Sequence, residues 1–416
     1  MIKPDKAAPP AAIPFHRPFI GKEEEDAVLR VLRSGWLTTA SETLAFEKEF
    51  AEFLMGADAP LVALAVNSAT SGLHLALEAC GVRQGDVVIV PTYTFTATAE
   101  VARYLGAEVA FVDCAKGSFN IDQAALEKTV TRLKNGLTAY ENGGPAGRPA
   151  AIIPVHFGGI PCNMAPVMDI AREHGLAVIE DAAHSFPSKL ESGVYAGAIG
   201  DAGVFSFYAT KTMTTGEGGM VVTQNPKIAS RISVMRCHGI DRAVWNRYTS
   251  GKASWYYEVI APGFKYNMTD IAAALGRQQL KRAGMLLSER KKIAALYDRA
   301  FGKNPCFILP PHDPANSYHL YPLRINPANC GVSRNQIIEK LQADKIGVSV
   351  HFIPLHTMPY YKKRYNLKDD DFPAALENFL NVISLPMWPG MTNEQIEKVI
   401  DSVLKASVLK SAKGNN

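Results

Sequence analysis

The sequence predicts an α/β protein that has a mainly parallel central sheet with helices on both faces, plus a smaller α+β part at the C-terminal end. Between residues 61 and 223, short apolar runs alternate with helical patterns, which is typical of βαβ units. Several apolar runs lack polar alternation, so we expect helices over both sheet faces. With 47% hydrophobic and 20% charged residues, a chain of 416 residues can bury a large core.

The expected elements follow one another in a regular order. Residues 1–17 are rich in proline and predict an N-terminal arm, and apolar spacing predicts helices over 23–33 and 42–54. The alternating region predicts strands at 61–66, 87–90, 109–112, 151–155, 177–179, 202–207 and 219–223. It predicts helices between them at 72–80, 96–105, 122–133 and 166–174. A long helix is expected over 269–290, after which the patterns are shorter and mixed.

Three segments do not fit this alternation. Residues 137–149 are rich in Gly and Pro and predict a surface loop, and the polar tail 405–416 is expected to fray. Residues 242–258 carry aromatic patches without a clear period, which is typical either of a long functional loop or of a lid packed on the core. The predicted parts are therefore an N-terminal arm (1–17), a large domain (18–260) and a smaller C-terminal domain (261–416).

Charge and cysteine content exclude several classes of protein. The chain has 44 basic and 40 acidic residues, a balance that does not favour nucleic acid or a membrane surface as a partner. No apolar run approaches the roughly 18 residues of a membrane helix, and the N-terminal arm lacks the apolar core of a signal peptide, so we expect a cytoplasmic protein. The six cysteines form no C-x-x-C pair, so we expect reduced thiols and no metal site.

Chemistry is expected beyond the carboxyl ends of the parallel strands, where ligands bind in open sheets. The segment Asn67–Gly72 lies between a predicted strand and a helix, and its hydroxyls are typical of a helix cap. The same position suits an anion, because free amides and the helix dipole converge there. Phe95 follows another strand, where it could stack on a flat cofactor or pack in the core.

Two further strand ends carry charged side chains. Glu180, Asp181 and His184 follow a buried strand, and Asp181 could be a helix cap, a structural partner or the acid that keeps a cofactor ring nitrogen protonated. Lys211 follows the apolar run 205–207 and precedes a run of threonines and glycines. It could be a solvated surface group or a Schiff-base nucleophile. The order of an anion site, an aromatic, an acid and a lysine is informative, and pyridoxal phosphate (PLP) is a cofactor that needs such an acid, because its pyridinium ring is an electron sink.

Longer motifs support this interpretation. They are SGWLTT (34–39), NSATSGLHLAL (67–77), PTYTF (91–95), EDAAH (180–184), FSFYATKTMTTGEGG (205–219), PGFKYNMTDIAAALG (262–276), IPLH (353–356) and SLPMWPGMT (384–392). Over nearly its whole length the chain resembles the DegT/StrS-type nucleotide-sugar aminotransferases, which are fold type I PLP enzymes. PGFKYN is especially similar to the members that make 4-amino sugars from 4-keto sugar nucleotides, such as the UDP-4-amino-4-deoxy-arabinose synthases.

The resemblance implies a role for each of the residues singled out above. Lys211 would form the Schiff base with PLP and then carry protons, and Asp181 would pair with the pyridinium nitrogen. His184 would lie near the ring hydroxyl, and Phe95 would stack on the ring. The phosphate would be held by Ala69, Thr70 and Ser206.

The resemblance also implies a homodimer with shared active sites, in which a loop carrying Lys265 and Asn267 reaches the neighbouring subunit. Many relatives read G-[FY]-N-Y-R where this chain has Gly263 to Asn267, so the usual phosphate-binding Asn is Lys265, which can meet a phosphate as a point charge. The usual Arg is Asn267, so its contact to the nucleotide is in question, and Ala40 replaces the usual Gly after SGWLTT.

The function implied is transfer of an amino group, with glutamate as donor, to the keto carbon of a nucleotide-linked sugar, at position 4, in polysaccharide or lipopolysaccharide synthesis. The alternatives are a sugar 3-aminotransferase, a PLP-dependent sugar dehydratase, in which the lysine is replaced by His, or a non-catalytic sugar-nucleotide sensor. A Rossmann dehydrogenase is excluded because no G-x-G-x-x-G follows the first parallel strand. His351 is a candidate for substrate binding, and for both His156 and His351 a structural role is equally open.

Overall fold

Seven strands form the central sheet of the computed structural model, which describes residues 12–57, 60–241 and 257–408. Their order across the sheet is β1-β7-β6-β5-β4-β2-β3, and the five strands from β6 to β3 are parallel, whereas β7 is antiparallel to both of its neighbours. The mainly parallel sheet is thus confirmed. The strands are β1 (Val62–Val66), β2 (Asp86–Pro91), β3 (Glu108–Val112), β4 (Arg148–Ile152), β5 (Ala177–Asp181), β6 (Ala202–Ser206) and β7 (Gly219–Thr223).

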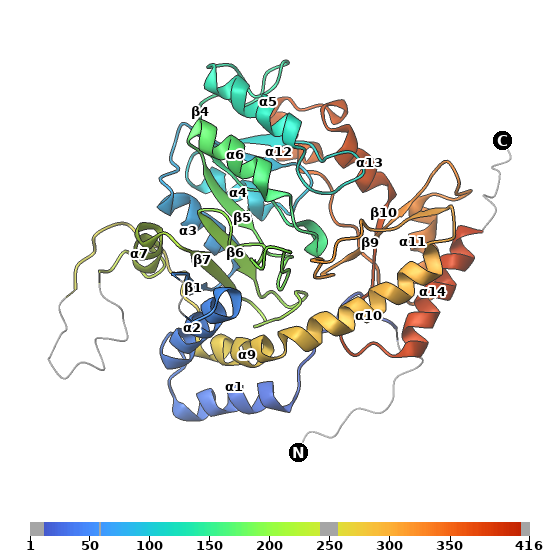
Figure 1. Ribbon diagram of the computed structural model, residues 1–416, viewed down its shortest axis with the longest axis horizontal. Coiled ribbons are helices and arrows are strands. Elements are labelled where there is room, and N and C mark those ends of the chain that lie inside the picture. Colours follow the sequence, from blue (N-terminus) through green and yellow to red (C-terminus); the bar gives the residue numbers. More distant parts are fainter. Residues whose placement is uncertain (1–11, 58–59, 242–256, 409–416) are drawn as a thin grey trace.

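Helices cover both faces of the sheet because successive side chains of each strand point to opposite faces. Val88 and Val90 of β2 join the core under one set of helices, and Val87 and Ile89 join the core under the other. The first set is α3 (Ala69–Ala79), α4 (Ala97–Tyr104) and α7 (Pro226–Met235). The second set is α2 (Ser41–Met55), α5 (Gln123–Lys134) and α6 (Met164–His174), as Figure 1 shows.

The predicted long helix over 269–290 is two helices, α9 (Asp270–Lys281) and α10 (Ala283–Phe301). Arg282 interrupts the helical backbone between them, and its guanidinium forms ion pairs with Glu23 and Glu24 of α1 (Lys22–Ser34). This tertiary contact has no counterpart in the apolar spacing, which is why the periodicity missed the break. α9 packs against α1 and α2, while α10 extends toward the C-terminal part of the chain (Figure 1).

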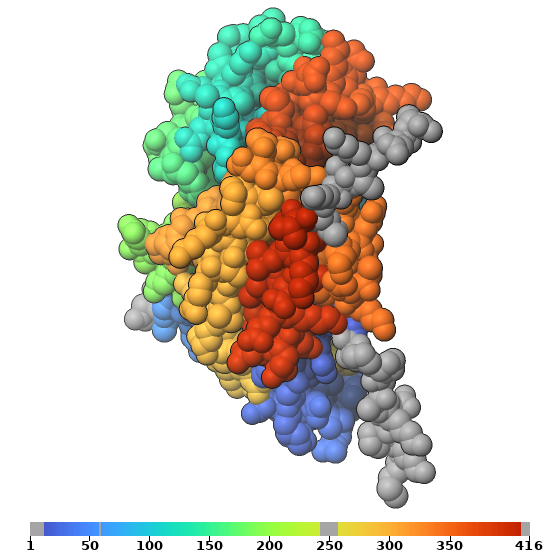
Figure 2. Space-filling model, turned by 90° about the vertical axis from the view of Figure 1, so that its right-hand side faces the viewer, coloured from blue at the N-terminus to red at the C-terminus, as the bar shows by residue number. Residues whose placement is uncertain are grey.

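A second sheet of three antiparallel strands forms the core of the C-terminal part. α10 and α14 lie side by side on one face of the molecule, as Figure 2 shows. The strands are β8 (Phe307–Ile308), β9 (Tyr321–Ile325) and β10 (Val382–Leu385). The helices are α11 (Arg334–Ala343), α12 (Pro359–Tyr365), α13 (Pro373–Asn381) and α14 (Asn393–Ser407). The division into domains at residues 260 and 261 stays a prediction.

Two predicted boundaries are wrong at their edges. Residues 405–407 do not fray but continue α14, whose apolar face packs in the C-terminal core, and residues 409–416 lie outside the described residues. β4 begins at Arg148, inside the predicted surface loop, because the Arg148 guanidinium binds the Asp86 carboxylate of β2 at 2.8 Å. Most of the segment 242–258, with its predicted loop or lid, lies outside the described residues. Across the described ranges, no helix is long and apolar enough to cross a membrane.

The described part of the N-terminal arm lies along the C-terminal part of the chain. The Ile13 N–H donates to the Lys345 carbonyl at 2.9 Å, and the Gly347 N–H donates to the Ile13 carbonyl at 2.7 Å. These two bonds fix the arm in an extended course, so that Phe15 and His16 reach the cavity described next.

Candidate active site

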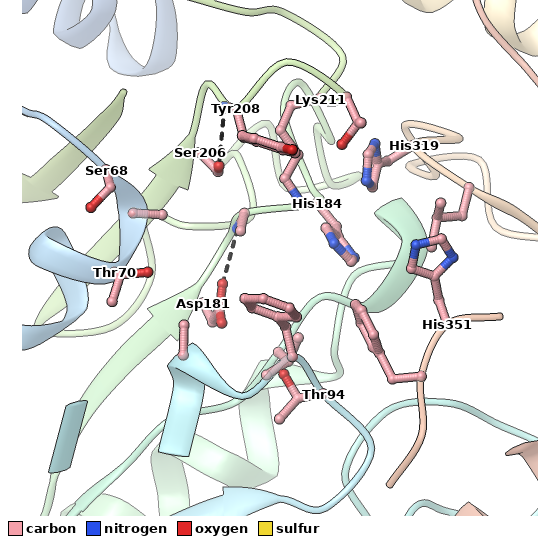
Figure 3. Close-up of a pocket in the computed structure, with 18 of the residues that line it drawn as sticks. Ser68, Thr70, Thr94, Asp181, His184, Ser206, Tyr208, Lys211, His319 and His351 are labelled. Carbon is pink, nitrogen blue, oxygen red and sulfur yellow. Dashed lines mark hydrogen bonds between the residues drawn. The ribbon is translucent and has the colours of Figure 1, made fainter. Parts of the chain in front are cut away.

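A cavity of about 520 Å³ lies at the carboxyl ends of β5 and β6, where an open parallel sheet is expected to bind ligands. Figure 3 shows its lining side chains converging on a shared space. The structure brings together eight of the predicted site residues: Ala69, Thr70, Phe95, Asp181, His184, Ser206, Lys211 and His351. Lys265 and Asn267 do not line this cavity.

One end of the cavity is the N-terminus of α3. The Ser68 hydroxyl caps the helix by accepting from the Ser71 N–H at 3.1 Å, which leaves the N–H groups of Ala69 and Thr70 without an intrahelical acceptor. Helix α3 can sit this close to the sheet because residue 72 is Gly: a Cβ there would lie 2.7 Å from a Val204 methyl group. The predicted cap and the predicted anion site are therefore compatible, since Ser68 serves the first and the free amides the second.

Asp181 ends β5 and lies in the middle of the cavity. Its carboxylate accepts from the Thr98 hydroxyl at 2.7 Å and from the Ala183 N–H at 3.2 Å. Burial raises the pKa of the Asp181 carboxyl, while these two hydrogen bonds and the charge of Lys211 oppose the rise. A buried carboxylate with an open side toward a cavity can bind a protonated ring nitrogen.

Lys211 lies beyond the end of β6, in a turn closed by a hydrogen bond from its own N–H to the Tyr208 carbonyl at 2.9 Å. Its side chain is half-buried and lines the cavity. Burial lowers the pKa of Lys211 to about 8, and the Asp181 carboxylate partly opposes this shift. The amine is therefore partly neutral near physiological pH, as a nucleophile must be.

His184 and Phe352 form the wall beside Lys211. The rings of His184 and Phe352 stack at 5.7 Å, and the Gly158 N–H donates to Nδ1 of His184 at 3.2 Å. Burial, and then the nearby charges of Lys211 and His351, hold the pKa of His184 well below its usual value. His184 is thus a neutral imidazole whose Nε2 carries the proton.

Phe95 projects into the open part of the cavity, where 58% of its surface is exposed. Its ring is tilted against that of Phe352, with 6.0 Å between the centroids. A large aromatic with so much free surface is not a core residue, so of the two readings of Phe95 the exposure favours stacking on a flat ligand.

Lys265 and Asn267 lie beside the end of β1, away from the cavity. The Lys265 ammonium donates to the Asn267 side-chain oxygen at 2.6 Å, and the Asn267 amide donates to the Thr39 hydroxyl at 2.6 Å. The backbone of this loop binds β1, since the Asn67 N–H donates to the Tyr266 carbonyl at 2.7 Å. Within one chain these two side chains contribute nothing to the cavity.

His156 has a structural role. Its Nδ1 accepts from the Cys162 N–H at 2.9 Å, so Nε2 carries the proton that is donated to Glu180 at 3.0 Å. Glu180 also accepts from three N–H groups of residues 197, 199 and 200, and the pair is fully buried.

Sequence reasoning missed Thr98, His16 and His319. Thr98 holds Asp181, and its spacing of four from Thr94, to which it is hydrogen-bonded at 2.7 Å, was the available signal. His16 lies in the N-terminal arm and His319 in a region of mixed patterns, so nothing local marked either histidine as a cavity residue. Both become neighbours only because the arm and the C-terminal part fold over the sheet.

The cavity fits PLP by the chemistry of its lining. Free amides and hydroxyls at one end suit a phosphate, a buried carboxylate in the middle suits a ring nitrogen, and an amine of lowered pKa lies beyond it (Figure 3).

Comparison with known proteins agrees with this geometry. The sequence pattern of the DegT/DnrJ/EryC1/StrS aminotransferase family matches residues 18–404. The chain belongs to this family. Its members are PLP-dependent, so the predictions of an aminotransferase, of its fold and of its cofactor are confirmed.

Among curated relatives, the spore coat polysaccharide biosynthesis protein SpsC of Bacillus subtilis is 43% identical over 394 residues, which cover 94% of this chain and 96% of SpsC. Among solved structures, the PLP form of Spr1654 from Streptococcus pneumoniae, named as a sugar aminotransferase, superposes with a TM-score of 0.82 at 30% identity. Helicobacter pylori PseC, an aminotransferase of pseudoaminic acid biosynthesis, has the same two values, and the match covers 95% of this chain and 99% of each structure.

Proposed function

We propose that this protein transfers an amino group from glutamate to the keto carbon at position 4 of a nucleotide-linked sugar. The observation that carries the proposal is the arrangement of an anion site, Asp181 and Lys211 along one cavity. Relatives named for polysaccharide and pseudoaminic acid biosynthesis support a sugar as acceptor. The preference for position 4 rests on the similarity of the segments 214–219 and 262–267 to relatives that act there.

PLP, when bound, supplies the electron sink and carries the amino group between the two substrates. The amides of Ala69 and Thr70 and the Ser206 hydroxyl would hold its phosphate, and Phe95, which lines the same cavity, would cover its ring. Asp181 keeps the ring nitrogen protonated, with Thr98 and Ala183 fixing the carboxylate. His184, whose Nδ1 accepts from the Gly158 N–H, would donate its Nε2–H to the ring hydroxyl.

Lys211 is the proposed nucleophile and proton carrier. Its amine would take the proton from the donor's reacting carbon in the first half-reaction and would give a proton to the sugar carbon in the second. The test is borohydride reduction of the yellow protein followed by peptide mapping, with the exposed Lys227→Ala variant as control. We expect cofactor fixed at residue 211 in wild type and Lys227→Ala. A colourless Lys211→Ala variant that still transaminates would overturn the assignment.

The working unit is proposed to be a homodimer in which Lys265 and Asn267 complete the neighbour's site. Both lie outside their own chain's cavity, and the Lys265 ammonium, whose contact is to the neutral Asn267 side chain, is suited to a substrate phosphate. Lys211→Ala and Lys265→Ala variants should each be inactive, and mixed dimers of the two should regain some activity because one site is then intact. Full activity of Lys265→Ala, or none in verified mixed dimers, would contradict subunit sharing.

The acceptor can be identified with a panel of 4-keto and 3-keto sugar nucleotides carrying UDP, dTDP or GDP, with glutamate as donor and mass spectrometry as readout. Amination of a 4-keto sugar alone supports the proposal, and amination of a 3-keto sugar alone replaces position 4 with position 3. The dehydratase alternative predicts loss of a hydroxyl without amination, and a non-catalytic sensor predicts neither product. The presence of both Lys211 and Asp181 argues against these last two.

A further inference from the structure

The end of the cavity opposite the phosphate site is lined by histidines. His184, His319 and His351 gather beyond Lys211, on the side away from Ser68 and Thr70, as Figure 3 shows. His16 of the N-terminal arm lines the same cavity. The rings of His184 and His319 lie 4.4 Å apart. His184 and His351 were singled out above, so we use the name histidine wall for the two additional residues, His16 and His319.

Both members of the histidine wall have a nitrogen without a partner. Nδ1 of His319 and Nε2 of His16 are buried and accept or donate no hydrogen bond to any described residue. Buried polar atoms are nearly always paired, because an unpaired one loses its bonds to water without replacement. Neither of these two atoms has surface open to the cavity, but Nε2 of His319 does, and it also has no hydrogen-bond partner among the described residues, so it is the atom available to a polar ligand there.

A buried cation lies directly behind this wall. Arg290 of α10 is fully buried, and its Nη1 donates to the carbonyls of Tyr318, His319 and Met387 at 3.1–3.2 Å. His319 and Met387 themselves line the cavity, so the guanidinium is one layer away from it. Nε and Nη2 of Arg290 have no partner among the described residues, and no described carboxylate forms an ion pair with this side chain.

The charges around the wall are therefore unbalanced. Burial and the charges of Arg290 and Lys211 lower the pKa of His16 to about 3, and burial, His184, Lys211 and Arg290 hold the pKa of His319 well below its usual value. Burial alone lowers the pKa of Arg290 to about 10. An anion in the cavity would offset the cost of burying the Arg290 charge and the smaller repulsion between Arg290, Lys211 and the histidines.

We propose that His16 and His319, backed by the charge of Arg290, bind the α-carboxylate of the amino donor. The inference rests on the proposed aminotransferase function, and it assigns the donor's recognition site. The phosphate of PLP has its own site at α3, so it leaves this end free. The donor's α-carboxylate is attached to the reacting carbon, so it must lie close to Lys211, and His319 lies on this side of the cavity (Figure 3).

The sugar ring of the acceptor has no carboxylate, and the acceptor's negative charge is on the diphosphate of its nucleotide, so we infer that the reacting end of the acceptor does not use the histidine wall. The two substrates can therefore share one cavity while being recognised by different groups. His16 and His319 contact the donor, whereas Arg290 is a positioning residue that orients His319 through its backbone and supplies long-range charge.

The test compares wild type with His319→Phe, which keeps an aromatic ring against His184 and removes the nitrogens. The donor half-reaction is followed by absorbance, with L-glutamate and with its α-amide. We expect the half-saturation concentration of glutamate to rise about 10- to 100-fold, as for loss of one hydrogen bond to a charged group. The half-saturation concentration of the α-amide, which lacks the charge, should rise much less. The rate of the return half-reaction with the keto sugar should stay within about twofold of the wild-type rate, because no contact to the sugar is lost.

Controls separate this effect from damage to the fold. His356→Phe is matched, because Nε2 of His356 is also buried and unpartnered but lies outside the cavity, and it should leave glutamate use unchanged. His319→Gln, which retains an N–H donor, should restore most of the affinity. If His319→Phe does not fold, His16→Phe replaces it, because His16 lies on the arm rather than in a core. Unchanged glutamate half-saturation in either folded variant overturns the inference.

A second readout does not depend on turnover. Calorimetric titration of the cofactor-free protein with 2-oxoglutarate should show binding that His319→Phe weakens by a similar factor. If wild type with PLP accepts an amino group from no amino acid, the proposed function fails, and weaker 2-oxoglutarate binding by His319→Phe still supports a carboxylate site. If wild type transaminates and the variants match it in both assays, the inference alone fails.

Discussion

Replacing Asp181 by Asn tests the central claim about the site, because the two side chains have the same shape and differ in charge. The Thr98 hydroxyl donates to Asp181 at 2.7 Å and also lies 2.7 Å from the Thr94 hydroxyl. In the variant, Thr98 can turn its hydrogen toward Thr94 and accept from the new amide, while the Ala183 N–H keeps the side-chain oxygen as its acceptor. The fold should therefore survive the change.

Asp181→Asn should lower the activity of the enzyme and raise the stability of the cofactor-free protein. Removing one partner of a buried charge pair costs about 2–5 kcal/mol, and about 1.36 kcal/mol is a factor of ten in rate, so turnover should fall roughly 30- to 5000-fold. The pKa of Asp181 is raised in the folded protein, so the ionised carboxylate disfavours folding once the pH exceeds the unfolded pKa. At pH 7 without cofactor, Asp181→Asn should therefore be more stable than wild type.

Two assays on the same preparations decide the outcome. Urea unfolding of the cofactor-free proteins measures the free energy of unfolding, and single-turnover absorbance with glutamate measures the rate of the donor half-reaction at saturating PLP. A rate within about threefold of wild type, too small for a lost charge pair, would refute the role of Asp181. A cofactor-free variant less stable than wild type would refute the electrostatic account of its burial.

Three other predictions are independent of Asp181. The rate at which cofactor-free protein takes up PLP should rise with pH and level off above about 8, the pKa of Lys211, and a continued rise toward pH 10 would contradict it. Gly72→Ala should cost about 1–3 kcal/mol in urea unfolding through its clash with Val204, whereas Gly284→Ala in open helix should stabilise by about 1 kcal/mol. Glu180→Gln should be less stable than wild type at pH 7, and the difference should shrink below pH 4.5 as the wild-type carboxylate protonates.

Much of the fold could be predicted because local pattern and tertiary structure agree in the βαβ region. Strands such as Val62–Val66 are apolar runs with turn residues on either side, and helices such as Gln123–Lys134 have apolar spacing and a capping Asp122. The break at Arg282 and the start of β4 at Arg148 could not be predicted, because both positions are defined by contacts with distant residues, among them ion pairs to Glu24 and Asp86. Such pairs leave no periodic trace in the sequence.

The candidate site was predictable to the extent that its residues follow strands. Lys211 and Asp181 come after β6 and at the end of β5, so strand prediction places them at the same sheet edge. His16, His319 and Arg290 were not predictable in this way. His16 and His319 reach the cavity from an arm and a bend, and Arg290 lies behind His319 on a long helix, so the packing of the C-terminal part on the sheet brings the three together.

The neighbouring carboxylates of β5 show why side-chain chemistry cannot be assigned from a motif alone. Glu180 and Asp181 are adjacent and both buried, yet they point to opposite faces of the strand, so one meets His156 and three N–H groups and the other meets the cavity. The bonds to His156 and to these amides overcome burial and lower the pKa of Glu180, whereas burial prevails and raises the pKa of Asp181. Glu180 is already satisfied by the protein and holds the strand end in place. The protein alone stabilises the ionised carboxylate of Asp181 poorly. A cationic ring in the cavity would supply the opposite charge that stabilises it.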